Sequence, residues 1–416
     1  MILCRCFFFA LLLFHGNAWL FAQEHDQHVI LISLDGYRYD YTDRFNPPHI
    51  SHLVNEGVSA KGMIRVFPTK TFPNHYSIAT GMKPAKNGLV DNTFFDPERG
   101  QVYKIHDRAV VQDGSWYGGM PIWSLAEKNG IRAASYFFVG SEADIAGIRP
   151  SYYYEYDGKV DNLTRINQVL DWLALPESER PRLITIYFSD MDDVGHRYGP
   201  DNDEKLREAI LKLDAELGTL FDGIKKFDLN INIILVSDHG MTNITQESLI
   251  DIKEIMDGIP ANYYNNGALA HVHLDDPSDE RKVWKRLRRK EGDFKIVDPF
   301  SRQYYGKKGN YSDRVGDFLI IPKLGHYLVE PSGFIKYQNR AAMFKSSTFG
   351  EHGFHPDFAD MHAIFYASGP ALKDRMIIDA FENTHVYPLV CTLLGLPVPK
   401  GIDGKLSVLE GILKKD

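Results

Sequence analysis

His28-Val-Ile-Leu-Ile-Ser-Leu-Asp-Gly36 is an apolar run that ends in an acidic residue and a glycine. A short apolar run without polar alternation is typical of a strand buried on both faces of a parallel sheet. Three later segments have the same character, and two segments between them have the apolar spacing of helices. The strand-like segments are Arg182–Phe188, Ile231–Val236 and Ala363–Ala367, and the helical segments are Ile50–Glu56 and Leu206–Phe227. This alternation predicts an α/β fold with a mostly parallel central sheet and helices on both faces.

Acidic and imidazole side chains closely follow the first three of these strands. In open α/β sheets ligands bind beyond the carboxyl ends of the strands, so we expect these side chains to meet at one edge. A single aspartate there is usually a turn former, but three such strand ends, two of them pairing Asp with His, indicate a metal centre. The residues concerned are Asp35, Asp192, His196, Asp238 and His239, and His352 is a further candidate.

The ligand types indicate which metal this centre would hold. Carboxylates and imidazoles without thiolates suit zinc well and manganese less well. The candidates are numerous enough for two ions. Two ions about 4 Å apart are a recurring arrangement for in-line displacement at phosphorus, where one stabilises the attacking oxygen and the other the leaving oxygen. The pattern therefore favours phosphoryl chemistry.

A nucleophile is predicted from the segment Pro68-Thr-Lys-Thr-Phe-Pro-Asn-His-Tyr76. Pro73 suits the first turn of a helix that begins near Phe72, which places Thr71 at the N-terminus of that helix. Exposed amides and the helix dipole favour an anionic phosphoryl group at such a position. A threonine hydroxyl needs activation, and coordination to a divalent metal would supply it. The alternative role of Thr71 is that of a helix cap.

Composition limits the classes of function. The chain has 416 residues, 44% of them hydrophobic and 25% charged, with a net charge of -8, which fits one large domain, or one with an inserted lobe. Because long runs of Lys and Arg are absent from the sequence, it does not favour binding to a nucleic-acid scaffold, whereas a small anionic substrate remains possible. Residues 278–323 are expected to form a small peripheral insert made of a surface helix and loops.

The first 23 residues read as a secretory signal peptide with cleavage near Ala22. The apolar part is too short to span a membrane, so no transmembrane segment is expected after its removal; an uncleaved anchor is the alternative. Removal leaves Cys391 as the one cysteine of the sequence, which excludes an internal disulfide. A large secreted animal enzyme usually has several disulfides, so we expect a bacterial protein that is periplasmic or secreted.

At this point the sequence resembles the nucleotide pyrophosphatase/phosphodiesterases of the alkaline phosphatase superfamily. The resemblance runs from about residue 28 to 410, and its longest motif is the threonine segment. The matching stretches are Ile32–Tyr37, Pro68–Gly81, Asn87–Asn92, Asp192–Pro200, Val236–Met241 and His352-Gly353. The resemblance implies an alkaline-phosphatase-like fold, with residues 24–416 as a single catalytic domain.

The resemblance also implies roles for individual residues. Thr71 would attack phosphorus and form a phospho-threonine intermediate that water cleaves. Asn92 would donate its amide, with the backbone N–H of Phe72, to a phosphoryl oxygen, since developing charge there needs fixed donors. Two Zn²⁺ ions are implied, one held by Asp35, Asp238, His239 and Thr71, the other by Asp192, His196 and His352. Residues expected to be structural are Asn74, His75, Asp190, Asp193 and His355.

The expected substrate is a small nucleotide, cleaved to a nucleoside 5′-monophosphate. A neutral Asn92 facing the phosphate favours diesters over monoesters, which benefit from an arginine or a third metal. Phe72 and Tyr156 would stack on the two faces of a base, by resemblance, and the segment from residues 136–142 through Pro150 would line the same pocket. The alternatives are a choline or lysophospholipid headgroup phosphodiesterase, a phosphomonoesterase, and a non-catalytic binding protein on the same fold.

Overall fold

The computed structural model describes residues 27–414, so the expected signal peptide lies outside the described residues. The central sheet has eight strands in the order β19-β2-β18-β9-β1-β8-β6-β7. All neighbouring pairs are parallel except those of β18. The bounds are β19 Met376–Ile378, β2 Val58–Ala60, β18 Phe365–Ser368, β9 Asn230–Val236, β1 Gln27–Leu34, β8 Leu183–Phe188, β6 Ala133–Tyr136 and β7 Tyr152–Tyr154.

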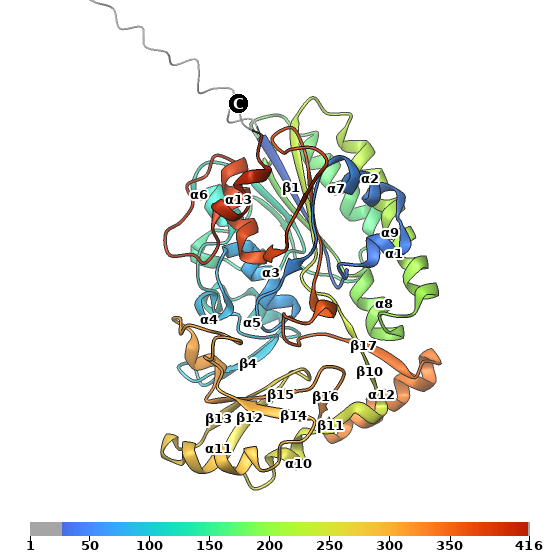
Figure 1. Cartoon of the computed structure of the whole chain (residues 1–416). Coiled ribbons are helices and arrows are strands. Elements are labelled where there is room, and N and C mark those ends of the chain that lie inside the picture. Colours follow the sequence, from blue (N-terminus) through green and yellow to red (C-terminus); the bar gives the residue numbers. More distant parts are fainter. Residues whose placement is uncertain (1–26, 415–416) are drawn as a thin grey trace, which may run out of the picture.

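Strand β1 shows why this sheet is covered on both faces. Successive side chains of a strand point to opposite faces, and β1 is apolar at both sets of positions. Ile30 and Ile32 pack with the helices α2, α7 and α9, while Val29 and Leu31 pack with α3, α6 and α13. Figure 1 shows these helices on the two sides of β1. Their bounds are α2 Pro48–Glu56, α7 Asn162–Leu173, α9 Asp203–Ile224, α3 Thr71–Thr80, α6 Ile122–Lys128 and α13 Val386–Leu393. The predicted fold class is confirmed.

The predicted strands and helices lie within a few residues of those observed, but the last strand differs in direction. The segment expected at 363–367 is β18, which begins at Phe365 and runs antiparallel to β9. The chain reaches β18 from β17 (Thr348–Glu351), near the carboxyl edge of the parallel strands, and the connection contains one short 3-10 turn. Because the chain enters β18 from this carboxyl edge, β18 runs back across the sheet, antiparallel to β9.

A second, smaller unit lies between β10 (Thr242–Thr245) and β17, which pair with each other and so bring its two ends together. We refer to residues 246–347 as the insert; it lies at the bottom of Figure 1. Its four-stranded antiparallel sheet has the order β12-β13-β15-β14 and a core of its own. The insert elements are β11 Leu249–Asp251, α10 Ile252–Met256, β12 Ala261–Asn265, β13 Ala270–Leu274, α11 Glu280–Arg288, β14 Phe294–Val297, β15 Phe318–Pro322, β16 Tyr327–Val329 and α12 Pro331–Phe344.

The expectation of a helix and loops over residues 278–323 was therefore only half right. Helix α11 is present, but β14 and β15 are paired strands. In β14 the buried Phe294 and Ile296 alternate with the exposed Lys295, which is the pattern of a strand with one face in a core. Strand β14 is only four residues long, and a polar loop follows it, so its alternating pattern was not recognised in the sequence.

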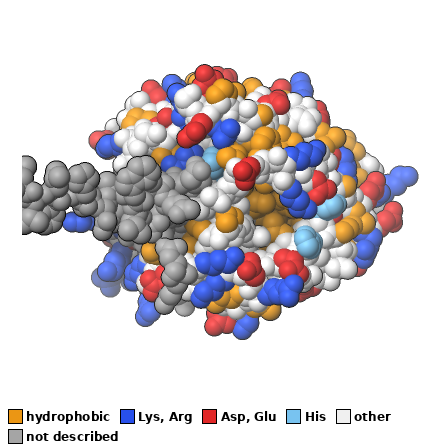
Figure 2. Space-filling view, turned by 90° about the horizontal axis from the view of Figure 1, so that it is seen from above, with side chains coloured by type: hydrophobic (Ala, Val, Ile, Leu, Met, Phe, Trp, Pro, Cys, Tyr) orange, Lys and Arg blue, Asp and Glu red, His pale blue; other side chains and the backbone are white. Residues whose placement is uncertain are grey.

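The remaining elements are short. Among them are α8 Asp190–Tyr198, β4 Thr93–Asp96 and β5 Gln101–Lys104, together with α1 Tyr41–Phe45, β3 Met63–Ile64, α4 Pro84–Asn87, α5 Arg108–Gln112 and β20 Phe381–Glu382. No helix within residues 27–414 combines the length and apolar character needed to cross a bilayer. On the face seen in Figure 2, basic and acidic side chains are interspersed rather than separated by sign.

Candidate metal centre and active site

The carboxyl ends of three adjacent strands form the floor of the site. β1 ends before Asp35, β9 ends just before Asp238 and His239, and β8 leads into α8. The register places Leu34 beside Phe188 and Ser33 beside Val236, so the three ends are level. The expected convergence of these strand ends is therefore observed.

Gly36 allows two of these ends to approach closely. Its φ is +69°, and a Cβ there would lie 2.8 Å from the Cα of Asp192, so a side chain would clash with backbone. Its N–H donates to Oδ1 of Asp238 at 3.1 Å, while the N–H of Asp192 donates to the carbonyl of Asp35 at 3.0 Å. The tight turn after β1 is therefore hydrogen-bonded to both Asp238 and Asp192.

Two groups of ligand atoms gather at this floor. Asp192, His196 and His352 form one group, and Asp35, Asp192 and His239 form another, with ligand atoms within 4.8 Å of one another in each. Asp238 adjoins the second group, because its Oδ2 lies 3.1 Å from Nε2 of His239. All six carboxylate and imidazole residues expected to bind metal thus lie together.

The three imidazoles are oriented alike. In His196, His239 and His352, Nδ1 lies 2.8 to 3.0 Å from a backbone carbonyl, that of Gly350, Gly240 and Thr69 respectively. A carbonyl only accepts, so each Nδ1–H donates, and in a neutral ring Nε2 presents a lone pair to the carboxylates. Burial lowers the pKa of His239 to about 3 and lowers that of His352, so these two rings are neutral. Burial also opposes the charged form of His196, but Asp192 and Glu351 outweigh it and raise the pKa of His196.

The carboxylates lack donors in the same place. Oδ1 of Asp35, Oδ1 of Asp192 and Oδ2 of Asp238 are buried and have no hydrogen-bond partner among the described residues. Burial raises the pKa of Asp35, the charges of Asp238 and Asp192 raise it further, and burial raises the pKa of Asp238 to about 7. Unpaired buried oxygens facing imidazole lone pairs are costly unless a cation lies between them. The residues present therefore fit divalent metal ions.

Thr71 is the first residue of α3, one position before the predicted start of that helix. Its hydroxyl oxygen lies 3.2 Å from Nε2 of His239, so it adjoins the group that contains Asp35 and Asp238. The N–H of Phe72 donates to Oδ1 of Asn92 at 3.1 Å. Within residues 27–414, Nδ2 of Asn92 makes no hydrogen bond. In this structure the N–H of Phe72 is therefore bonded to Asn92 and is not, as had been expected, free for a phosphoryl oxygen. Nδ2 of Asn92 is left as the free donor.

A cavity of about 270 Å³ opens above Thr71. Phe72 and Tyr156 line it, as expected from the sequence, and so do residues 137–140 and Glu142. Tyr156 packs edge-on against Phe137 and Tyr187. The neighbouring tyrosines 152–154 form β7 instead, and two of them pack on Trp172. The cavity is therefore lined by aromatic rings together with polar and charged side chains, among them Asp35 and Asp192 of the ligand groups.

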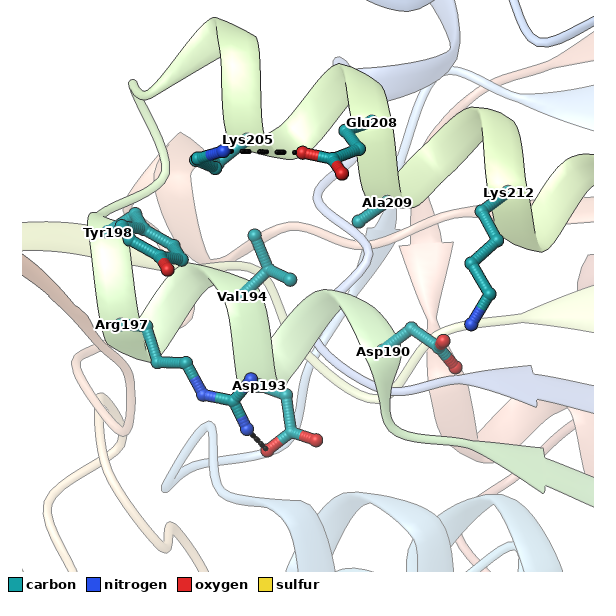
Figure 3. A pocket seen from close by; sticks show the side chains of 9 residues that line it. All are labelled: Asp190, Asp193, Val194, Arg197, Tyr198, Lys205, Glu208, Ala209 and Lys212. Atoms are coloured by element: carbon teal, nitrogen blue, oxygen red, sulfur yellow. Dashed lines mark hydrogen bonds and ion pairs between the residues drawn. The ribbon is translucent and has the colours of Figure 1, made fainter. Parts of the chain in front are cut away.

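Another cavity, of about 380 Å³, lies between α8 and α9 (Figure 3). Four of its charged side chains pair with one another: Lys205 with Glu208, and Arg197 with Asp193. Among the lining residues only Asp193 also borders the cavity above Thr71, and no predicted metal ligand lines the cavity in Figure 3. The chemistry-bearing side chains of α8 lie on the opposite face of that helix.

Sequence reasoning missed two residues that support the site. His75, expected to be structural, donates from Nδ1 to the carbonyl of Thr71 at 2.9 Å, and the same atom lies 3.3 Å from Oδ2 of Asp238. Tyr187 donates its hydroxyl to Oδ2 of Asp35 at 2.5 Å. The available signals were the four-residue spacing from Thr71 to His75, which puts both on one helix face, and a polar residue within the buried strand β8.

The pair of Arg108 and Glu142 at the cavity wall was also missed, and nothing in the sequence near Arg108 indicates it. The other residues expected to be structural lie outside the ligand groups. Asn74 bonds to the loop before α3, Asp190 accepts from Asn162, and His355 contacts the carbonyl of Gln303.

Comparisons with known proteins agree with this geometry. Residues 29–354 match the family described as type I phosphodiesterase/nucleotide pyrophosphatase. The chain is 34% identical over 403 residues to human ectonucleotide pyrophosphatase/phosphodiesterase family member 1, covering 92% of this chain and 41% of that protein. It is 34% identical over 399 residues to venom phosphodiesterase 2 of Crotalus adamanteus, covering 92% and 47%. The chain thus spans less than half the length of these relatives.

Two solved structures are similar over nearly the whole chain. Human ectonucleotide pyrophosphatase/phosphodiesterase 5 superposes with a TM-score of 0.84 at 27% identity, covering 94% of this chain and 100% of that one. An inactive variant of the murine protein, in which one threonine is replaced by alanine, is a complex with AMP. It superposes with a TM-score of 0.83 at 26% identity, covering 93% and 100%.

Proposed function

The chain belongs to the type I phosphodiesterase/nucleotide pyrophosphatase family, and from this premise we propose that it hydrolyses nucleotide phosphodiester or pyrophosphate bonds to nucleoside 5′-monophosphates. One observation carries the proposal: three unpartnered carboxylate oxygens and three imidazole Nε2 atoms converge beside the hydroxyl of Thr71. The AMP complex of the murine relative supports a nucleotide as the substrate.

The metal ligands divide into two sets. Asp35, Asp238 and His239, with Thr71, would hold one ion, and we call them the inner group. Asp192, His196 and His352 would hold the other, and we call them the outer group. Two divalent ions, zinc on the basis of this thiolate-free donor set, would supply positive charge that stabilises the alkoxide of Thr71 and the leaving oxygen.

The residues of the chain then perform two successive displacements. Oγ1 of Thr71 attacks phosphorus, an ester bond to Thr71 forms, and the alcohol or phosphate leaves from the opposite side. Water then cleaves this phospho-threonine, which restores the hydroxyl and releases the nucleoside 5′-monophosphate. Nδ2 of Asn92 donates to the non-bridging oxygen that gains charge in both steps. His75 holds the carbonyl of Thr71 and so fixes the start of α3.

The aromatic cavity supports a nucleoside as the second substituent. Phe72 and Tyr156 offer ring faces, and stacking between aromatic rings tolerates different bases. The neutral Asn92 favours a diester, which carries one charge fewer than a monoester. The same rings beside Glu142 and Asp193 would also suit a quaternary ammonium, so a choline headgroup is the alternative substrate.

Comparing p-nitrophenyl thymidine 5′-monophosphate, p-nitrophenyl phosphorylcholine and p-nitrophenyl phosphate as substrates of the zinc-loaded protein tests the proposal. We expect the thymidine ester to be cleaved with the highest kcat/KM. Preference for the choline ester would indicate the headgroup activity, and preference for p-nitrophenyl phosphate a monoesterase. Turnover of none of the three would indicate a binding protein.

Residues 24–416 are proposed to form a single catalytic domain that is exported after removal of residues 1–23. The names of the relatives, which are ectoenzymes and venom enzymes, support export. N-terminal sequencing of the exported protein is expected to begin near Gln23; a chain that begins at Met1 would contradict cleavage.

A further inference from the structure

The insert makes several contacts with residues 90–96, the segment that contains Asn92. The hydroxyl of Tyr305 donates to the carbonyl of Val90 at 2.8 Å. The side chain of Asn266 pairs with both backbone groups of Thr93, at 3.0 and 2.7 Å. Beyond these contacts, Tyr264 stacks on Phe95, and Arg314 forms an ion pair with Asp96. The insert therefore binds this segment on both sides of Asn92.

The contact closest to Asn92 is a buried pair of ionisable residues. Nε2 of His271, in β13, lies 3.0 Å from Oδ2 of Asp91, and both side chains are fully buried. The other carboxylate oxygen, Oδ1, accepts the backbone N–H of Asn92 at 2.7 Å. On the far side of the ring, Nδ1 of His271 lies 2.9 Å from the carbonyl of Val315. A continuous chain of hydrogen bonds thus links β13 to Asn92.

The geometry determines how many protons this series of hydrogen bonds contains. The carbonyl of Val315 only accepts, so Nδ1–H of His271 donates to it. The contact between Nε2 and Oδ2 then needs a second proton, which lies between His271 and Asp91. A neutral ring facing an ionised Asp91 would place a lone pair against a carboxylate in a dry interior, which is costly.

The orientation of Asn92 is therefore set at two points. Asp91 fixes its backbone N–H, and the N–H of Phe72 binds its side-chain oxygen at 3.1 Å. What remains free is Nδ2, the atom that would donate to the phosphoryl oxygen. A donor fixed before the reaction stabilises developing charge without further reorganisation.

We propose that His271 and Asp91 are positioning residues for Asn92, through which the insert holds the phosphoryl-oxygen donor in place. This inference rests on the proposed function, because it assigns Asn92 a role in the transition state. It gives the insert a part in the reaction although the insert supplies none of the predicted metal ligands.

A double-mutant cycle on kcat tests the inference, with p-nitrophenyl thymidine 5′-monophosphate as substrate and the full chain loaded with zinc. Asp91→Ala should lower kcat by about 10²-fold with KM and zinc content unchanged, because a small misplacement of a catalytic group has effects of this size. In the Asn92→Ala background the same substitution should lower kcat by less than about twofold, because residues that act as a unit are not additive. Equal losses in both backgrounds would overturn the inference.

Asp91→Asn is the matched control. Its side-chain oxygen still accepts from Asn92, and its amide can donate to Nε2 of a neutral His271, so the hydrogen-bond chain survives without the extra proton. We expect kcat within about threefold of wild type. A folded Asp91→Asn variant that is as slow as Asp91→Ala would contradict the account.

If Asp91→Ala does not fold, His271→Gln replaces it in the cycle. Its amide keeps a donor for Asp91 but loses the bond to Val315, so kcat should fall by about tenfold, again with no further loss in the Asn92→Ala background. Circular dichroism and melting curves confirm folding of each variant. Absence of turnover by the wild-type chain would overturn the proposed function as well, whereas turnover with an additive cycle would overturn this inference alone.

Discussion

The inner and outer groups of proposed metal ligands differ in how the fold holds them. Asp35 and Asp238 lie at the ends of adjacent central strands, with His239 beside them, and their side chains are at most 2% exposed. In the outer group, Asp192 and His196 lie on α8 and are 20% and 28% exposed, while His352 follows β17, outside the central sheet. Thr71, the proposed nucleophile, adjoins the inner group. The proposed attacking oxygen therefore lies beside the more buried group, and two of the three residues of the outer group are partly exposed.

The largest expected loss of activity comes from a substitution at the inner group. Thr71→Ala removes the attacking oxygen while its neighbours keep their contacts, so turnover of the thymidine ester should fall by at least about 10³-fold. Thr71→Ser keeps a hydroxyl in the same place and serves as the control, with measurable turnover expected. Retention of more than about a tenth of wild-type activity by Thr71→Ala would remove Thr71 from the role of nucleophile.

Asn92→Ala comes next, because it removes one donor to the oxygen that gains charge. The expected loss is about 3–4 kcal/mol of transition-state stabilisation, measured as kcat/KM, which is the usual contribution of an oxyanion donor. Asn266→Ala is a suitable control, since it loosens the same segment without removing the donor. An unchanged rate in Asn92→Ala would show that Asn92 does not donate to the phosphoryl oxygen.

The difference in exposure predicts two rates of metal loss. During incubation with a chelator, the ion of the outer group should leave first, because His196 and Asp192 are accessible to solvent. Following bound zinc by mass spectrometry should show two phases of one ion each, and His196→Ala should remove the faster phase. A single phase that releases both ions would show that the two groups do not differ as described.

The smallest effect concerns the stability of the metal-free protein. Asp238 has a raised pKa of about 7 in the fold, so the folded state binds more protons than the unfolded state between its ordinary pKa and pH 7. Its contribution to stability is therefore present at low pH and is lost as pH rises through about 7. Metal-free Asp238→Asn should show a weaker decline of Tm over this range than metal-free wild type. An identical pH dependence would contradict the raised pKa that burial gives Asp238.

Features of the fold and site could be predicted where a local sequence pattern marks them, and not where they depend on contacts between distant residues. Asp35, Asp238 and His239 could be predicted because each follows a buried apolar strand closely, and parallel strands bring their ends together. His352 was a further candidate without such a signal, and its place in the outer group, like the role of Asn92, came from the resemblance to a family. The pairing of Asp91 with His271 joins residues 180 positions apart without a shared motif, and it depends on a sheet whose strand β14 is only four residues long. The direction of β18 likewise depends on the edge of the sheet from which the chain enters it, which a pattern of apolar residues does not show.

The central claim is that two cations are held beside the hydroxyl of Thr71. A crystal structure of the zinc-loaded protein, with anomalous diffraction recorded at the zinc edge, tests it most directly. We predict two peaks, one among Asp35, Asp238 and His239 and within coordination distance of Thr71, the other among Asp192, His196 and His352. Absence of a peak from either group, or peaks that lie away from Thr71, would contradict the account.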